Sequence, residues 1–420
     1  MPAAKTMHLP SLAQVLLSGV ALLLFLSAAA GMFTAGLLAI TVGRFSGGDA
    51  IPFFSLGWSA TTIGVLLLPS LVYPLYRLMG HPRPDWLALD HARLANRAML
   101  LWLPLLLLGE LISRDQAINW LVLPPIQVLV IGIPIWWFIE VGRRGLPGNR
   151  LQRDWGMLGI ALVVIPVIVL LVEILIIGSL ALLLFAWAAT QPELMETLNR
   201  VSQRLVNAQF DPEITLRILR PYLRHPAVIY LITAVTAGIV PLIEELLKPI
   251  ALWGVDKRRL TPQEGFVLGL LCGGAFAFIE SQGMLSAPMS DAWAFTVIGR
   301  TGTGLLHTIT AGLVGWGLVS AWRGEKYIRL GLIFFIAAGI HGIWNLFGVL
   351  MGLLPLAHPS EGMIVFDRLS ATAAPALATL SVALFILLIG SNKRLRQQPE
   401  AVYAASGEGE LIPINGGNQP

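Results

Sequence analysis

Charged side chains are scarce in this 420-residue chain. Asp, Glu, Lys and Arg make up 12% of it and hydrophobic residues 56%, and the mean hydropathy is +0.75. Soluble domains carry about 25% charged residues, so the composition excludes a soluble globular protein. Only one cysteine is present, Cys272, which excludes a disulfide framework and any CxxC metal or redox motif.

Long apolar runs take the place of the missing charges. A transmembrane helix needs about 20 mostly apolar residues, and about ten runs approach that length. They cover residues 15–42, 53–76, 98–112, 117–139, 156–189, 227–253, 264–286, 292–321, 330–353 and 370–391. We therefore predict an all-α, polytopic integral membrane helical bundle with about ten transmembrane helices and a four-helix catalytic core in its C-terminal half.

Two of these runs leave room for alternatives. The run at 98–112 contains Pro104 and ends at charged residues, so it either crosses the membrane or re-enters together with the next run. The run at 15–42 is longer than the 7–15 apolar residues of a signal peptide. We interpret it as an uncleaved first span.

Basic residues predict the orientation. The second, fourth, sixth and eighth connections and the C-terminal tail carry three or four Lys or Arg residues each, and most of the other connections carry one or none. By the positive-inside rule both termini are cytoplasmic. The fifth connection is long and is the exception, with five arginines and helical spacing of its apolar residues. The net charge of +4 is spread between apolar blocks, and it predicts lipid bilayer rather than nucleic acid as the partner.

These patterns divide the chain into five segments. We expect an N-terminal transmembrane region of about five spans, an extracytoplasmic amphipathic connector, a catalytic core, a last transmembrane helix and a disordered cytoplasmic tail. They occupy residues 1–189, 190–226, 227–353, 354–392 and 393–420 in that order.

Ionisable residues inside spans are costly and are functional candidates by default. Four consecutive spans between 227 and 353 concentrate them. The set consists of Glu244, Glu245, Lys248, Glu280, Arg300, His307, His341 and Asn345. Counted at 1.5 Å per residue from the charged residues at the cytoplasmic ends of their helices, Glu244, Glu280, His307 and His341 all lie about 18–24 Å deep. We interpret this common depth as one cluster.

Spacing within the helices adds to that interpretation. Glu244 and Lys248 are four residues apart, so Lys248 can pair with this carboxylate and keep it ionised. His341 and Asn345 have the same spacing. Such residues can activate water, because a carboxylate beside imidazoles accepts a proton and an amide stabilises the resulting oxyanion. Zinc held by His307, His341 and Glu280 is the alternative, although no short metal-ligand spacing is present.

The same residues resemble motifs of the PrsW family of intramembrane proteases, which is related to the type II CAAX prenyl proteases and the Abi family. Glu244, Glu245 and Lys248 resemble its EExxK motif, and Phe276 with Glu280 resembles FxxxE. His307 matches the third motif, and His341 with Asn345 the last. Ser281 stands where PrsW relatives commonly have Asn.

The resemblance implies a function. It makes the protein an intramembrane endopeptidase of a bacterial plasma membrane that cleaves membrane-anchored substrates such as anti-sigma factors. It implies Glu244 as general base, assisted by His307 and His341, with Asn345 in the oxyanion site. Glu245, Lys248 and Glu280 organise the pocket. Both a glutamate-dependent and a metallo-type mechanism stay open, and so does the oligomeric state.

Two other classes of function compete with a protease. A proton-coupled secondary transporter would use Glu244, Glu280 and His307 as a relay, although no internal repeat is present. A non-catalytic membrane scaffold is the third alternative. Arg300 is either an interface anchor or a substrate clamp, and we expect Glu173, in the fifth apolar run, to be structural.

Overall fold

The computed structural model describes residues 8–41, 50–81, 90–147, 151–209, 211–223, 225–257, 260–286, 292–353 and 364–398. These residues form helices and no strands, which confirms the predicted all-α class. Within this part of the chain, nine helices are long and apolar enough to cross a membrane, or ten if one bent helix pair is counted as a span. The predicted polytopic membrane protein is therefore confirmed.

The chain divides into two compact units. The first comprises 1–166, 248–333 and 382–420, and the second comprises 167–247 and 334–381. The chain passes between them within three long helices and at the peptide bond between Leu247 and Lys248. Glu244 and Glu245 thus belong to the second unit, and Lys248 begins a segment of the first.

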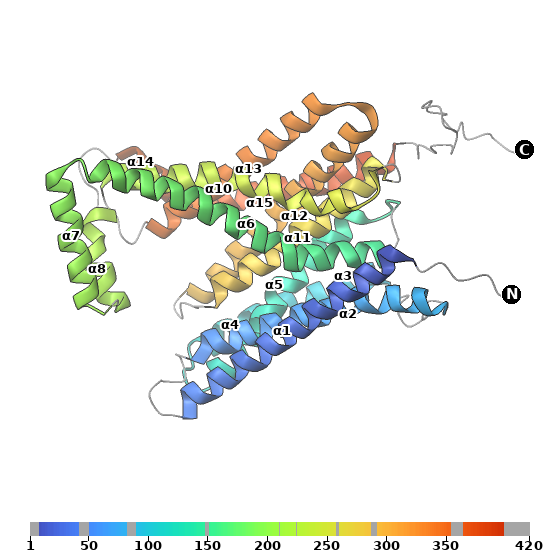
Figure 1. Cartoon of the computed structure of the whole chain (residues 1–420), viewed down its shortest axis with the longest axis horizontal. Coiled ribbons are helices and arrows are strands. Elements are labelled where there is room, and N and C mark those ends of the chain that lie inside the picture. Colours follow the sequence, from blue (N-terminus) through green and yellow to red (C-terminus); the bar gives the residue numbers. More distant parts are fainter. Residues whose placement is uncertain are drawn as a thin grey trace, which may run out of the picture. The chain divides into compact units, whose positions relative to one another are not determined.

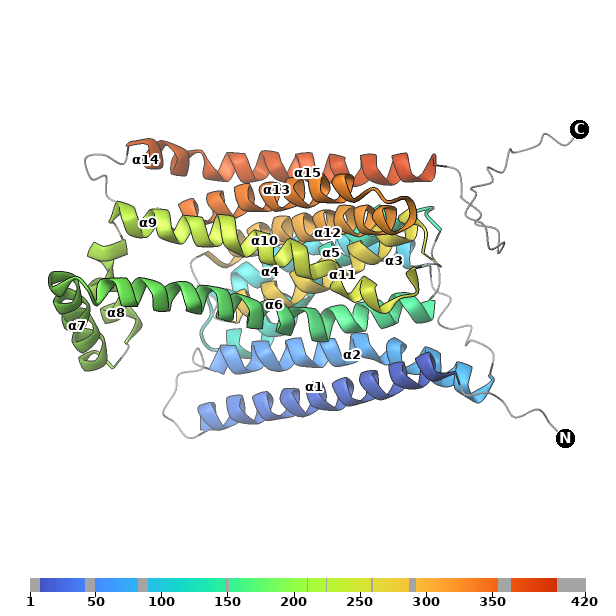
Figure 2. The ribbon, with the colours of Figure 1, turned by 45° about the horizontal axis from the view of Figure 1, so that its top comes forward.

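The first unit opens with a helical hairpin. Helices α1 (Leu9–Thr41) and α2 (Ile51–Met79) pack side by side along their length (Figures 1 and 2). The hydroxyls of Ser18 and Ser70 are 2.8 Å apart, near the start of α1 and the end of α2. The two helices therefore run antiparallel. Helix α2 stops at Gly80, whose φ of 72° is the left-handed conformation that glycine adopts without strain.

The bent pair is formed by α3 (His91–Leu100) and α4 (Trp102–Ser113), which meet at 44°. Pro104 has no backbone N–H, so the regular helical hydrogen bond to the carbonyl of Leu100 cannot form at this break. The pair follows α5 (Asn119–Arg143) along its length: the Trp137 indole donates to Asn96, and the Trp102 indole to the Val130 carbonyl. The run at 98–112, left open by the sequence, thus runs antiparallel to α5.

Helices α11 (Pro262–Leu285) and α12 (Trp293–Gly324) form the closest pair of the first unit. A Cβ atom at Gly269 or Gly273 would collide with the backbone carbonyl oxygen of Ala311 or His307. Helix α11 begins with a capping box, in which Thr261 and Glu264 bond each other's backbone N–H. This tight packing fixes the α11 residues relative to those of α12.

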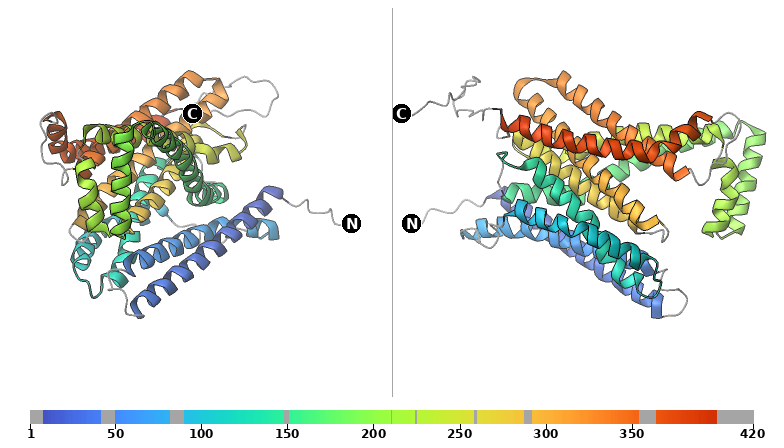
Figure 3. Two further views of the ribbon diagram at one scale, coloured as in Figure 1. Left: turned by 60° about the vertical axis from the view of Figure 1, so that its left-hand side comes forward. Right: turned by 180° about the vertical axis from the view of Figure 1, so that it is seen from behind.

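The second unit holds the predicted connector and the segment before the paired glutamates. It contains the latter part of α6 (Leu151–Ala188), α7 (Pro192–Asn207), α8 (Pro212–Leu223) and α9 (Pro226–Thr233). A π-helical turn, η3 (Ala234–Ile239), and α10 (Val240–Leu247) follow. Figure 3 shows α7 and α8 side by side. The expected helical connector is present; its extracytoplasmic position stays a prediction.

The rest of the second unit comes from α13 (Tyr327–Leu353), α14 (Ile364–Ala371) and the start of α15 (Ala373–Arg396). Helix α15 continues past the boundary predicted at residue 393, so the last basic residues are helical. The predicted tail from 399 to 420 and the segment 354–363 lie outside the described residues.

Candidate functional site

The first unit holds a chain of contacts centred on His307. This imidazole is 1% exposed and lies in the middle of α12. Its Nδ1 is 2.6 Å from Nζ of Lys248, and its Nε2 is 2.8 Å from Oε2 of Glu280. A lysine ammonium can only donate, so Nδ1 accepts and the Nε2 proton is donated to Glu280. Both ring nitrogens are therefore engaged, and the tautomer is fixed.

Glu280 is held from a second direction by Arg300. The guanidinium contacts both carboxylate oxygens, with Nη1 3.2 Å from Oε1 and Nη2 2.8 Å from Oε2. Its Nε donates to the hydroxyl of Ser281 at 3.0 Å. Arg300 thus orients the carboxylate that orients His307. From the sequence, Arg300 was either an interface anchor or a substrate clamp. In the structure it is the ion-pair partner of Glu280.

Lys248 is fully buried at the start of the 3₁₀ segment η4 (Lys248–Gly254). Its ammonium lies 5.0 Å from the centre of the Phe276 ring, a cation–π contact that helps to compensate for burial. The same ring meets the His307 imidazole edge-on at 5.3 Å between centroids. Phe276 therefore closes one side of the Lys248–His307 pair, a role that the FxxxE motif alone did not indicate.

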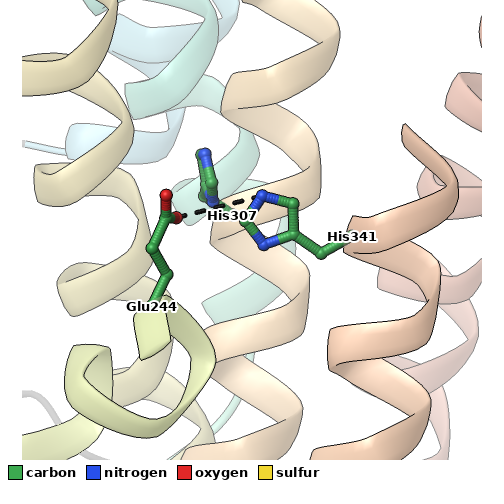
Figure 4. A group of neighbouring side chains, drawn as sticks. All are labelled: Glu244, His307 and His341. Carbon is green, nitrogen blue, oxygen red and sulfur yellow. Dashed lines mark ion pairs between the residues drawn. The ribbon is translucent and has the colours of Figure 1, made fainter. Parts of the chain in front are cut away.

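The second unit holds the paired glutamates with His341. Glu244, Glu245 and His341 are 5%, 0% and 1% exposed. Nδ1 of His341 is 2.9 Å from Oε1 of Glu245, and its Nε2 is 3.9 Å from Oε2 of Glu244. Figure 4 marks the Glu244–His341 pair, with His307 of the first unit also drawn. Glu245 thus orients the ring, and Nε2 is the nitrogen on the side of Glu244.

Asn345 lies one helical turn beyond His341. Its Nδ2 donates to the carbonyl oxygen of Thr236 at 2.9 Å. Thr236 belongs to the π-helical turn η3, where carbonyl oxygens depart from the regular α-helical hydrogen-bond pattern and single π turns are frequent at functional sites. Sequence reasoning did not identify Thr236, because its side chain carries no signal and its contribution is a backbone carbonyl.

The predicted residues are thus brought together as two groups. One joins Lys248, Glu280, Arg300 and His307, and the other joins Glu244, Glu245 and His341. The expected Glu244–Lys248 pair and the joining of the two groups into one cluster span both units and stay predictions. The two groups are close along the chain, since only Leu246 and Leu247 separate Glu245 from Lys248.

Fold and side chains together define a class: a polytopic, all-helical membrane protein whose spans carry two buried histidines, each paired with a carboxylate. Residues 219–370 match the family model described as the PrsW family of intramembrane metalloproteases. This confirms the resemblance to the PrsW family over that region, which contains all eight predicted site residues. The relation to CAAX prenyl proteases and Abi proteins stays a prediction. Neither a curated protein nor a solved structure matches the chain.

Proposed function

We propose that the protein is an intramembrane endopeptidase that hydrolyses peptide bonds of membrane-anchored proteins with a water molecule activated by Glu244. The observation that carries this proposal is the placement of Glu244 beside His341. Their facing atoms, Oε2 and Nε2, are 3.9 Å apart. An oxygen atom can lie at about 2.8 Å from both, a normal hydrogen-bond distance, so one water can contact a base and an imidazole together.

The two histidines take different roles in this proposal. His341 has Nε2 directed to the water, and Glu245 at Nδ1 stabilises the ring when it takes up a proton. It is therefore the proton-transfer residue. His307 has both nitrogens engaged by Lys248 and Glu280. It therefore acts as a positioning group that holds Lys248 and Glu280 in place.

Zinc is the natural alternative to direct activation by Glu244, because the matching family is described as one of metalloproteases. Glu244, His307 and His341 would hold it, a donor set of one carboxylate and two imidazoles that occurs in catalytic zinc sites. A bound zinc ion would supply a water that ionises near neutral pH. The second unit fits this role, since Glu245 supports His341 as carboxylates support metal-bound histidines. His307 fits only if Lys248 or Glu280 leaves its ring.

The experiment maps newly formed N-termini in a membrane proteome. Purified protein in liposomes is incubated with membrane proteins from the host cells, and mass spectrometry locates the cleaved bonds. Wild type is expected to produce cleavages within or beside single transmembrane segments, and Glu244→Gln and His341→Ala are expected to lose them at least 100-fold. Glu196→Gln, on the exposed surface of α7, is the matched control.

Four outcomes separate the alternatives. Wild-type cleavage that survives a chelator supports water activated by Glu244 alone, and loss on chelation with recovery on adding zinc supports the metal. Identical termini from wild type and Glu244→Gln would disprove the proposed function. Proton-coupled uptake in the same liposomes that depends on Glu244 would establish the transporter.

A further inference from the structure

A large cavity lies within the first unit. Its volume is about 800 Å³, and helices α2, α3, α4, α5, α6 and α11 line it. None of the eight predicted site residues is among its lining residues. The volume falls in the range of about 300–1,000 Å³ that is typical of small-ligand sites.

The polarity of the cavity changes along its length. One end is lined by apolar residues of α4 and of the middle of α5, including Leu105, Val128 and Leu129. On α5, Val128 and Arg143 both line the cavity, 15 residues apart, which is about 22 Å of helix. One leaflet with its headgroup region is about 20–22 Å thick. The cavity thus has the length of one lipid.

The opposite end gathers all the ionisable residues of the lining: His91, Glu140, Arg143 and Asp154. Arg143 makes a bidentate contact with Glu140. Asp154 is 6% exposed and is paired with Arg153, which also bonds Glu264. With His91 neutral, one arginine faces two carboxylates, which gives this end of the cavity a net charge of −1. Adding Arg153 and Glu264 leaves the balance unchanged.

This charge balance selects the headgroup. A purely anionic headgroup would meet two carboxylates, whereas a zwitterionic one offers an ammonium to Glu140 and Asp154 and a phosphate to Arg143. Trp136 and Trp155 also line the cavity. The Trp136 indole donates to Glu140, one helical turn further on, and Trp155 directly follows Asp154. Indole faces attract ammonium groups. We propose that this cavity binds one zwitterionic phospholipid, with its ammonium between Glu140 and Asp154 and its acyl chains along α4 and α5.

The test counts retained lipids by native mass spectrometry. Delipidated full-length protein in detergent is given equal amounts of phosphatidylethanolamine and phosphatidylglycerol with the same acyl chains. Wild type is expected to retain one phosphatidylethanolamine with at least tenfold preference. Gly132→Leu is expected to lose it, because a Cβ there meets only Phe278, at 3.6 Å, and the longer side chain fills the cavity. Asp154→Asn is expected to lose the preference for the ammonium headgroup.

Gly178→Leu is the matched control, since this glycine of α6 has nothing within 4 Å of its Cβ position and lies outside the cavity. Leu129→Phe is a second filling variant at a partly exposed wall position, for use if Gly132→Leu does not fold. Equal retention of both lipids by wild type, or preference for phosphatidylglycerol, would overturn the headgroup assignment. Undiminished binding in a folded filling variant would overturn the location.

Discussion

Carboxylates hold both buried imidazoles, but at opposite ring nitrogens. Glu280 contacts Nε2 of His307, and Glu245 contacts Nδ1 of His341. The remaining nitrogen of His307 bonds Lys248, and that of His341 is directed to Glu244. The two histidines are therefore not interchangeable. The His341 ring can exchange a proton at Nε2 without leaving its support, whereas any new partner of His307 must displace an existing one.

Glu245→Gln tests this support. Glutamine keeps the size of the side chain and a hydrogen-bond acceptor but lacks the negative charge that stabilises protonated His341. We expect kcat to fall about 10- to 100-fold, as supporting carboxylates of histidine ligands do when mutated, with KM and the thermal denaturation midpoint nearly unchanged. Initial rates on a substrate found by the proteome experiment, together with thermal unfolding, measure this.

Glu193→Gln, on the exposed start of α7, controls for the loss of a glutamate charge. A Glu245→Gln variant with full kcat would show that the carboxylate is dispensable. A loss of folded protein in step with the loss of rate would show that Glu245 acts on stability alone.

At the scale of elements, the α11–α12 pair positions the first group. Glycines at 269 and 273 let α11 approach the backbone of α12 at Ala311 and His307. The glycines of these two spans are a sequence signal for such closeness, because small residues permit close packing of membrane helices. It did not predict the π-helical turn η3, since Ala234–Ile239 contains no residue that marks one. The Asn345–Thr236 contact depends on that turn and could not be derived either.

Gly273→Ala is expected to disturb this pair. The added methyl meets the backbone carbonyl of His307, which cannot move aside as a flexible side chain can. Overpacking of this kind costs about 1–3 kcal/mol or more, and it displaces His307 relative to Glu280. We expect a lower thermal denaturation midpoint and lower peptidase activity. Fluorescence-monitored unfolding in detergent measures the first effect.

Gly283→Ala provides a control in the same helix, because its Cβ position has nothing within 4 Å. Replacing a helical glycine by alanine in open space is expected to stabilise the helix by about 0.5–1 kcal/mol. Equal midpoints for the two variants would mean that the α11–α12 contact tolerates a methyl group, and the packing argument would then be wrong.

At the scale of the whole molecule, contacts within the first unit predict that the start of α1 and the end of α15 lie on one face of the membrane. Near the start of α1, Gln14 bonds the Gln152 carbonyl at the start of α6. Near the end of α15, Asn392 bonds the carbonyl oxygens of Gly142 and Arg144 at the end of α5. Helices α5 and α6 are consecutive, so we expect all these ends to share one face. An even number of crossings would follow, ten if the bent pair α3–α4 is counted as one span.

This face carries most of the basic connections, so the positive-inside rule predicts that it is cytoplasmic. Single cysteines test the prediction in a Cys272→Ser background, labelled with a membrane-impermeant maleimide. His8→Cys and Gln398→Cys are expected to react only after cell lysis, and Asp115→Cys and Arg200→Cys are expected to react in intact cells. The Cys272→Ser parent is the unlabelled control. Different behaviour at residues 8 and 398 would mean an odd number of crossings and would contradict the shared face. If all four positions showed the opposite labelling, the number of crossings would still be even. The arginines of α7 and α8, rather than the even-numbered connections, would then set the orientation.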